Sequence, residues 1–143
     1  MTQRIIYPTP EGGVAVIIPV LESGLTIEEI AAKDVPAGVQ FQIVDVADIP
    51  ADRTFRGAWE HTEAGVNVSV PKAKEIHKNR WRDARGPLLA ALDTAFLKAV
   101  EADDAAAKAA IVAKKQALRD VTKTALPNDI EGIKAKWPEV LNG

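Results

Sequence analysis

The second half of the chain carries the pattern that most constrains the fold, a helical repeat of apolar residues. Apolar side chains three or four positions apart lie on one face of an α-helix. The first such stripe consists of Leu88, Leu92, Phe96 and Val100. The second, over roughly residues 105–122, contains Ala110, Ile111, Leu118 and Val121. A short acidic segment, EADDA, separates the stripes, so the sequence predicts an antiparallel helical hairpin within residues 71–143.

Signals for helix ends agree with this hairpin. Pro71 suits the first turn of a helix, and Asp103 or Asp104 can cap the second helix. Three basic residues lie toward the end of the second helix, where the dipole favours positive charge: Lys114, Lys115 and Arg119. Six alanines are predicted to let the two backbones approach closely: Ala106, Ala107, Ala109, Ala110, Ala113 and Ala117. Pro127 stops the hairpin, and a short tail element over KWPEVLNG follows.

The sequence pattern of the first half predicts a small α+β lobe. Residues 4–20 contain two short β runs joined by a turn rich in proline and glycine. Because Pro8 and Pro10 cannot donate to a ladder, we expect the first run to be an outer strand or to end early. Thr26 and Glu29 have the spacing of a capping box, which predicts a short helix over IEEIAAK.

Two further strands are expected in this lobe. FQIVDV alternates in the manner of a mostly buried strand, and VNVSV (66–70) makes another. Phe55 and Trp59 anchor a turn in the connector between them. The predicted fold is therefore α+β, with a small lobe of a β-hairpin and mixed α/β elements at residues 1–70, followed by the helical hairpin at 71–143.

A basic segment, residues 72–85, joins the two parts. It has six Lys or Arg against Glu75 and Asp83, a net charge of +4. On a helix one face of it carries Lys74, Lys78, Arg82 and Arg85. That face becomes apolar after Gly86 and Pro87, so we expect either a kink at Pro87 or a first half that leaves the body of the protein. Either arrangement predicts that residues 72–85 lie at the surface and outside the core.

This basic face has three interpretations. A solvated helix face is the plainest one, with long side chains covering apolar surface. An acidic protein partner is the next. Nucleic acid is the third, because Trp81 between Arg80 and Arg82 could stack on a base. The whole chain has a formal net charge of −2, which makes nucleic acid the least favoured partner.

No catalytic, cofactor or metal site is predicted. The chain has no Cys, and His61 and His77 match no metal-ligand spacing. Asp45, Asp48 and Asp52 could approach a hard cation, but the glycine that an EF-hand loop needs is missing, so surface acids are the better interpretation. Ser23 and Ser69, the only serines, lie in no nucleophile elbow. No stretch approaches the roughly 20 apolar residues of a membrane span, and no signal peptide is evident, so we expect a soluble protein with no membrane partner.

The C-terminal part resembles the helical region of tailed-bacteriophage tail-fibre assembly proteins and tail assembly chaperones. Those chains carry R-x-x-L-L-x-x-x-D, then R-Q-A-L-R-D, then a proline-containing spacer and W-P. The matching residues here are Arg85, Leu88, Leu89 and Asp93, then Lys115 to Asp120, then Pro127, then Trp137 and Pro138. Lys115 stands where the usual residue is Arg, and Thr94 where a Trp often follows the Asp. The resemblance covers residues 85–138.

The N-terminal part resembles small proteins from phage tail gene regions that carry K-D-V-P-x-G and D-R-T-F-R-x-A-W-E. Here these segments are Lys33 to Gly38 and Asp52 to Glu60. No chemistry is attached to that lobe, and it differs from the usual N-terminus of the assembly chaperones.

Together the resemblances imply a tail or tail-fibre protein that assembles by protein–protein contacts. The implied partners are tail-fibre or other tail proteins, with the chain itself repeated in a symmetric homo-oligomer. The implied location is the host cytoplasm during assembly, with retention in the virion tail left open. The expected partner-binding residues are Lys74, Lys78, Trp81, Arg82, Arg85, Arg119, Asp120 and Trp137. The alternative function is a small nucleic-acid-binding regulator that uses the basic segment 72–85.

Overall fold

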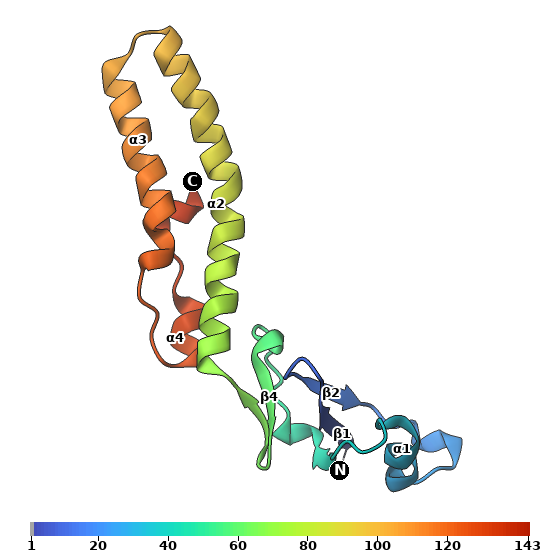
Figure 1. Ribbon diagram of the computed structural model, residues 1–143. Helices are drawn as coiled ribbons and strands as arrows, with labels where there is room; N and C mark the ends of the chain where they lie inside the picture. The colour runs from blue at the N-terminus through green and yellow to red at the C-terminus, as the bar shows by residue number, and fades with distance from the viewer. Residues whose placement is uncertain (1) are drawn as a thin grey trace. The chain divides into compact units, whose positions relative to one another are not determined.

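The computed structural model describes residues 2–143, which divide into two compact units, Met1–Ala73 and Lys74–Gly143. The division falls inside the first turns of a long helix, close to the predicted boundary at residue 70. The first unit contains short strands and one short helix, and the second is helical (Figure 1). The mixed α+β class predicted from the sequence is confirmed.

A three-stranded antiparallel sheet forms the centre of the first unit. Its strands are β1 (Gln3–Pro8), β2 (Val14–Ile17) and β3 (Gln42–Asp45), in the order β2-β1-β3. Of the two alternatives expected for the first β run, the early end is confirmed at Pro8, and β1 is the central strand and not an outer one. Pro8 is tolerated because β3 pairs only with residues 3–6 of β1, so the missing N–H faces no neighbouring strand.

Helix α1 (Ile27–Asp34) covers part of this sheet and begins at the predicted capping box. The Thr26 side chain accepts from the Glu29 N–H, and the Glu29 carboxylate accepts from the Thr26 N–H at 2.8 Å. Ile27 and Ile30 then pack on Ile5 of β1. The prediction that β3 is mostly buried is wrong, because all four of its residues are only half-buried and the preceding Phe41 is exposed.

A second sheet in the same unit pairs β4 (Trp59–Thr62) with β5 (Gly65–Val68). The sequence predicted β5 but not β4. Trp59 begins β4 with 1% of its surface exposed and packs against Ile6 and Val14 of the first sheet. Three 3₁₀ turns complete the unit: η1 (Leu21–Ser23), η2 (Val46–Asp48) and η3 (Arg56–Ala58).

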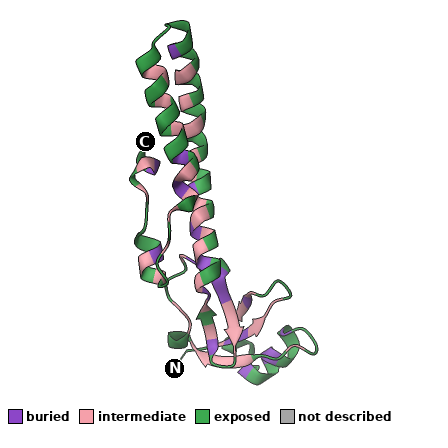
Figure 2. Cartoon of the chain, turned by 60° about the vertical axis from the view of Figure 1, so that its left-hand side comes forward, coloured by how far each residue is buried: buried purple, intermediate pink, exposed green. Residues whose placement is uncertain are grey.

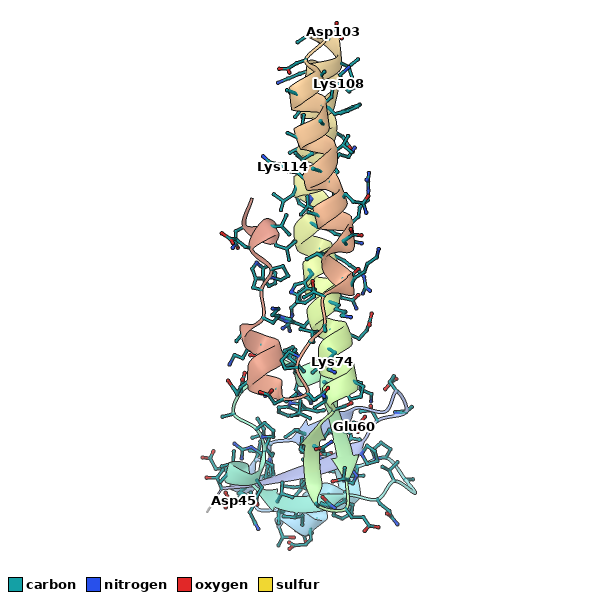
Figure 3. All side chains as sticks on the ribbon, turned by 90° about the vertical axis from the view of Figure 1, so that its left-hand side faces the viewer. Asp45, Glu60, Lys74, Asp103, Lys108 and Lys114 are labelled. Carbon is teal, nitrogen blue, oxygen red and sulfur yellow. The ribbon has the colours of Figure 1, made fainter. Side chains whose placement is uncertain are left out.

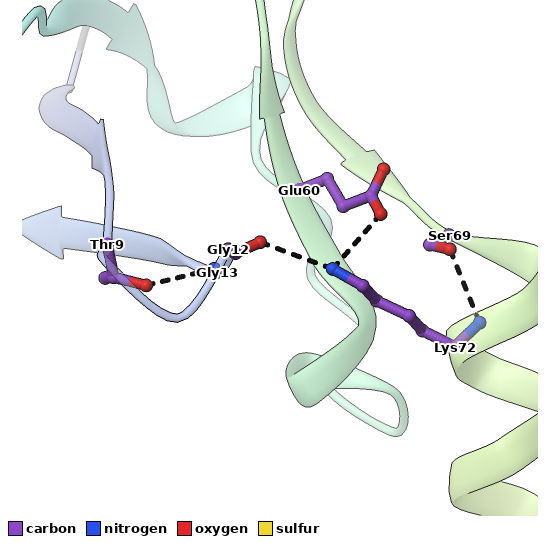
Figure 4. A network of polar contacts seen from close by, with 6 residues as sticks. All are labelled: Thr9, Gly12, Gly13, Glu60, Ser69 and Lys72. Atoms are coloured by element: carbon purple, nitrogen blue, oxygen red, sulfur yellow. Dashed lines mark hydrogen bonds and ion pairs between the residues drawn. The ribbon is translucent and has the colours of Figure 1, made fainter.

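Lys72 links separate parts of the first unit (Figure 4). Its Nζ lies 3.1 Å from Oε1 of Glu60 on β4 and donates to the carbonyl of Gly12 in the β1–β2 turn at 3.4 Å. Its backbone N–H donates to the Ser69 hydroxyl at 3.4 Å. A residue of the predicted basic arm therefore serves to hold the lobe together.

The second unit is built on an antiparallel pair of helices, as predicted (Figure 1). They are α2 (Val70–Glu101) and α3 (Ala105–Asp120). Asp104 caps α3, since its carboxylate accepts from the Ala107 N–H at 3.0 Å. The chain then passes through η4 (Val121–Lys123), α4 (Ile130–Ala135) and η5 (Glu139–Asn142), which lie alongside the two helices.

The core of the second unit centres on Trp81, which has 0% of its surface exposed. Around it are buried Leu118, Val121 and Leu141. Half-buried apolar residues complete the cluster: Ala84, Leu88, Leu89, Leu92, Leu126 and Val140. The packed stripe thus continues along α2, with buried positions in the basic segment and half-buried ones in the Leu-rich part (Figure 2).

This burial contradicts the expectation that residues 72–85 lie outside the core. Ala73, His77 and Trp81 are buried, and more of this segment is covered than of residues 88–100. Each buried position is followed directly by a basic one, so the buried stripe and the basic stripe are adjacent on the helix. No change of face at Gly86 is needed, because the buried stripe runs from His77 to Leu88 on one side.

Helix α2 continues through Pro87 without a break. Asp83, Gly86 and Pro87 are all exposed. The Asp83 carbonyl that loses its N–H partner therefore lies on the side of the helix that faces water, where water can satisfy it.

The alanines of α3 do not line the contact between the helices, which corrects a second expectation. Five of the six are exposed, and only Ala107 is half-buried. Larger residues face α2 instead, with Leu118 buried and Ile111 half-buried. Alanine favours a helix at any position, so its frequency indicates the helix but not the buried face.

Candidate functional site

The predicted partner-binding residues all lie in the second unit, but several of them bind other parts of the chain. Lys74 Nζ contacts Oδ1 of Asn128 at 2.5 Å. Arg82 Nη1 lies 2.9 Å from Oε1 of Glu75 and also contacts Asn79. Lys78 is half-buried and forms no ion pair with any residue that the structure describes.

Trp81 cannot act as predicted, because its ring lies inside the core. His77 packs edge-on against it, with the ring centroids 5.5 Å apart. A base could stack on Trp81 only after the cluster with Leu118 and Val121 had opened. Trp81 therefore offers no exposed ring on which a nucleic-acid base could stack.

Arg85 connects the two helices of the hairpin. Its Nη1 donates to the carbonyl of Arg119 at 3.1 Å and to that of Leu118 at 3.4 Å. The last carbonyls of a helix have no partner within the helix and carry partial negative charge, so a guanidinium stabilises them. Arg85 thus caps the end of α3 from α2 and is a structural residue.

A second link joins the same helices nearer the turn. Lys115 Nζ lies 2.5 Å from Oδ1 of Asp93 and 5.7 Å from the centroid of the Phe96 ring. Asp93 ends the R-x-x-L-L-x-x-x-D segment, and Lys115 begins the K-Q-A-L-R-D segment. The two segments that carry the family resemblance therefore contact each other at both ends, through Arg85 and through Asp93.

The other three predicted residues lie at the surface to different degrees. Arg119 is exposed, and Asp120 accepts from Lys123 and Gln116, each at 3.0 Å. The hydrogen bond from Lys123, followed by that from Gln116, holds the pKa of Asp120 below its ordinary value. Trp137 keeps 41% of its surface exposed, and its ring meets that of His77 edge-on at 6.1 Å.

The C-terminal segment is held against α2 by the same histidine. Nε2 of His77 lies 2.7 Å from the carbonyl oxygen of Lys136. Further along, Leu141 is 7% exposed and packs in the Trp81 cluster. These contacts place Glu139 and Val140 beside the hairpin.

An apolar groove opens where α2, α3 and η5 meet. Its volume is about 470 Å³, and it is lined by Leu88, Ala91, Leu92, Lys114, Leu118, Glu139, Val140 and Gly143. Figure 3 shows Lys114 projecting toward the side on which the C-terminal segment lies. Sequence reasoning noted the leucines as core and missed the groove, because nothing in the pattern indicated that η5 folds back onto the hairpin.

The first unit has a hollow of about 650 Å³ beside β3 and β4. It is lined by residues 39–42 and 61–63, including His61 and Glu63. Gln42 spans it by donating to the carbonyls of Thr62 and Glu63 at 3.2 and 2.9 Å. Among residues 2–143, no group of three or more metal-ligating side chains lies close enough to hold an ion.

Two of the three acidic residues that could approach a cation, Asp45 and Asp52, instead stabilise local turns. Asp45 accepts from the Ala47 N–H, and Asp52 accepts from the backbone and hydroxyl of Thr54. No helix within the described part of the chain is long and apolar enough to cross a membrane.

Comparisons with protein-family models, curated protein sequences and solved structures found no match to this chain.

The buried position of Leu118 gives a direct test of the hairpin. Leu118→Ala is expected to lower the free energy of unfolding by about 2–5 kcal/mol, because the side chain is 2% exposed beside Trp81 and Val121. Arg119→Ala, at the next residue, should cost about 0.5 kcal/mol or less. Urea unfolding followed by far-UV circular dichroism measures both. A stable Leu118→Ala beside an unfolded Arg119→Ala would contradict the observed packing.

Proposed function

We propose that this chain is a non-enzymatic structural or assembly protein of a phage tail or tail fibre, which acts by binding other tail proteins through its helical unit. The observation that supports this most is the contact between the two segments that carry the resemblance. Arg85 reaches the end of α3, and Asp93 pairs with Lys115. The hairpin thus holds the two segments side by side, as a single binding unit would require.

The surface next to these contacts suits protein binding. The groove has apolar side chains from Leu88, Leu92 and Leu118, with charged residues at its margins. An apolar centre with a polar rim is the usual anatomy of a protein interface. Arg119 lies exposed at the end of α3, where its side chain is open to a partner.

Nucleic-acid binding is not proposed as a second function. Trp81 is buried, and Lys74 and Arg82 already contact side chains of the chain itself. The formal net charge of −2 also opposes binding to phosphate backbones.

The test is affinity capture of the tagged chain from phage-producing cells, together with mass spectrometry of purified virions. We expect tail or tail-fibre proteins to be enriched with the wild-type chain and to remain bound at high salt, because an apolar centre is not screened. Arg119→Ala should reduce their recovery about tenfold, a loss of about 1.4 kcal/mol, while the protein stays folded. Detection of the chain in purified virions would show that it is retained in the finished particle.

Two results would overturn this function. One is the absence of any tail protein from the captured set in cells that assemble complete tails. The other is retention of DNA or RNA whose binding falls steeply with salt, since counterion release is the signature of phosphate contacts.

A further inference from the structure

The groove of the helical unit carries one positive and one negative residue that have no ion pair in residues 2–143. Lys114 projects from α3, and Glu139 lies on η5 across the groove. The other lysines between residues 105 and 123 are paired: Lys108 with Asp103, Lys115 with Asp93, and Lys123 with Asp120. Lys114 therefore differs from these lysines, because it lines the groove and forms no ion pair with a described residue.

Between these two charges the groove floor is apolar. Leu88, Ala91 and Leu92 come from α2, and Leu118 from α3. The volume of the groove is about 470 Å³. Such a floor fits large apolar side chains of a partner. At the margins, Lys114 attracts an acidic residue and Glu139 attracts a basic residue.

We propose that this groove binds an amphipathic α-helix of a partner protein. The helix lays an apolar stripe on Leu88, Leu92 and Leu118, with an acidic residue toward Lys114 and a basic residue toward Glu139. This inference rests on the proposed function and names the chemistry of the partner segment at the same site.

The walls of the groove indicate whether the bound partner segment is a helix or an extended strand. Two of them are helices, whose backbone N–H and C=O groups are bonded within α2 and α3. An extended segment laid between them would find few backbone partners, and unpaired backbone groups are costly when buried. A helix satisfies its own backbone and needs only side-chain contacts, which is the usual mode of binding in an apolar groove.

The experiment is a display selection from a library of helix-forming peptides about 20 residues long, the length of a 30 Å helix. The full chain serves as bait in two forms, wild type and the double variant Lys114→Glu/Glu139→Lys. We expect peptides selected by the wild type to carry apolar residues at i, i+3 or i+4, and i+7. Acidic and basic residues should flank this apolar stripe. In peptides selected by the double variant, acidic residues should stand where the wild type selects basic ones, and basic residues where it selects acidic ones.

A matched pair of alanines on α2 provides the control. Ala90 and Ala91 are both exposed, but only Ala91 lines the groove. Ala91→Trp fills the groove and should raise the Kd of a selected peptide at least about tenfold, or about 1.4 kcal/mol. Ala90→Trp should leave the Kd unchanged. Fluorescence anisotropy measures the Kd, and circular dichroism confirms that both variants are folded.

Equal binding by Ala91→Trp and the wild type would overturn the inference. So would peptides whose charges do not exchange with the double variant, a test that does not depend on the tryptophan variants folding. Self-association of the chain that Ala91→Trp abolishes would also overturn it, because the occupant would then be a second copy.

Failure of this inference and failure of the proposed function are distinguishable. If tail proteins are captured equally by Ala91→Trp and the wild type, the function stands and the groove is not its site. If peptides bind as expected but no tail protein is captured, the groove binds helices and the assignment to a phage tail is wrong.

Discussion

Replacing Trp81 with alanine is expected to lower the free energy of unfolding by about 3–5 kcal/mol, the range for removing a buried aromatic side chain. The indole is fully buried, in contact with Leu118, Val121 and Leu141, so its loss leaves a cavity that connects α2, α3 and η5. Its Nε1 has no hydrogen-bond partner among the described residues, so the effect comes from packing. Trp81→Phe should therefore cost distinctly less than Trp81→Ala.

Trp137→Ala is the matched control for this prediction. Trp137 is the same residue type in the same unit, but 41% of its surface is exposed. Its replacement should cost about 1 kcal/mol, which is ordinary for a partly exposed position. Urea unfolding followed by circular dichroism at 222 nm reports the helices. If Trp81→Ala lowered the free energy of unfolding no more than Trp137→Ala does, Trp81 would not be a core residue. The predicted surface role of Trp81 would then hold.

The prediction of the helical hairpin succeeded because its signals were local. Asp104 caps α3, and Thr26 with Glu29 forms the capping box of α1, since side-chain caps depend on residues three positions apart. The stripe of leucines on α2 also indicated its helix correctly. None of these features requires knowledge of distant contacts.

The buried face of α2 could not be chosen from periodicity alone. The stripe through His77, Trp81 and Ala84 lies one residue from the basic stripe, about 100° away on the helix. The buried stripe begins with alanine and histidine, which are weakly hydrophobic, whereas the basic stripe is conspicuous. Burial of Trp81 depends on Leu141, about 60 positions later in the chain, which no local pattern reveals.

The strand errors have the same origin. The central position of β1 depends on its pairing with β3, where Ile5 pairs with Ile43, a residue that follows β2 and α1 in the chain. Strand β4 has Glu60 and His61 among its four residues, and these are half-buried, so its sequence shows no apolar alternation. It forms because Trp59 is held in the core and because β5 supplies the partner backbone.

For the candidate site, the sequence supplied the segments but not their geometry. It identified Arg85 and Asp93 as parts of a motif and assigned Arg85 to a partner. In the structure, both residues form contacts between α2 and α3. The groove was missed because one wall is η5, and its return to the hairpin depends on Leu141 and on the bond between His77 and the Lys136 carbonyl.

The other large effect is expected in the first unit, where Trp59→Ala should destabilise the sheets by about 3–5 kcal/mol. Trp59 is 1% exposed and joins the two sheets by packing on Ile6 and Val14. The Arg56 guanidinium lies 4.3 Å from the centre of its ring, and its Nη2 donates to the Val14 carbonyl at 2.6 Å. The ring thus stabilises a cation that also binds the edge of β2.

The electrostatics of Arg56 explain why the aromatic face matters. Burial lowers the pKa of Arg56, and the positive charge of Arg53 lowers it further. Both causes disfavour the charged guanidinium, which the face of the Trp59 ring attracts. Trp59→Phe keeps an aromatic face below Arg56, so we expect a smaller loss than with alanine.

Hydrogen exchange of the strand amides is the appropriate measurement, because circular dichroism is dominated by the helices of the other unit. In Trp59→Ala the protection of β1, β2, β4 and β5 should fall together, since the indole contacts both sheets. Phe41→Ala is the matched control, an aromatic residue beside β3 with 41% of its surface exposed, and should leave protection nearly unchanged. Loss of protection confined to β4 and β5 would mean that the two sheets are stabilised separately and that Trp59 does not join them.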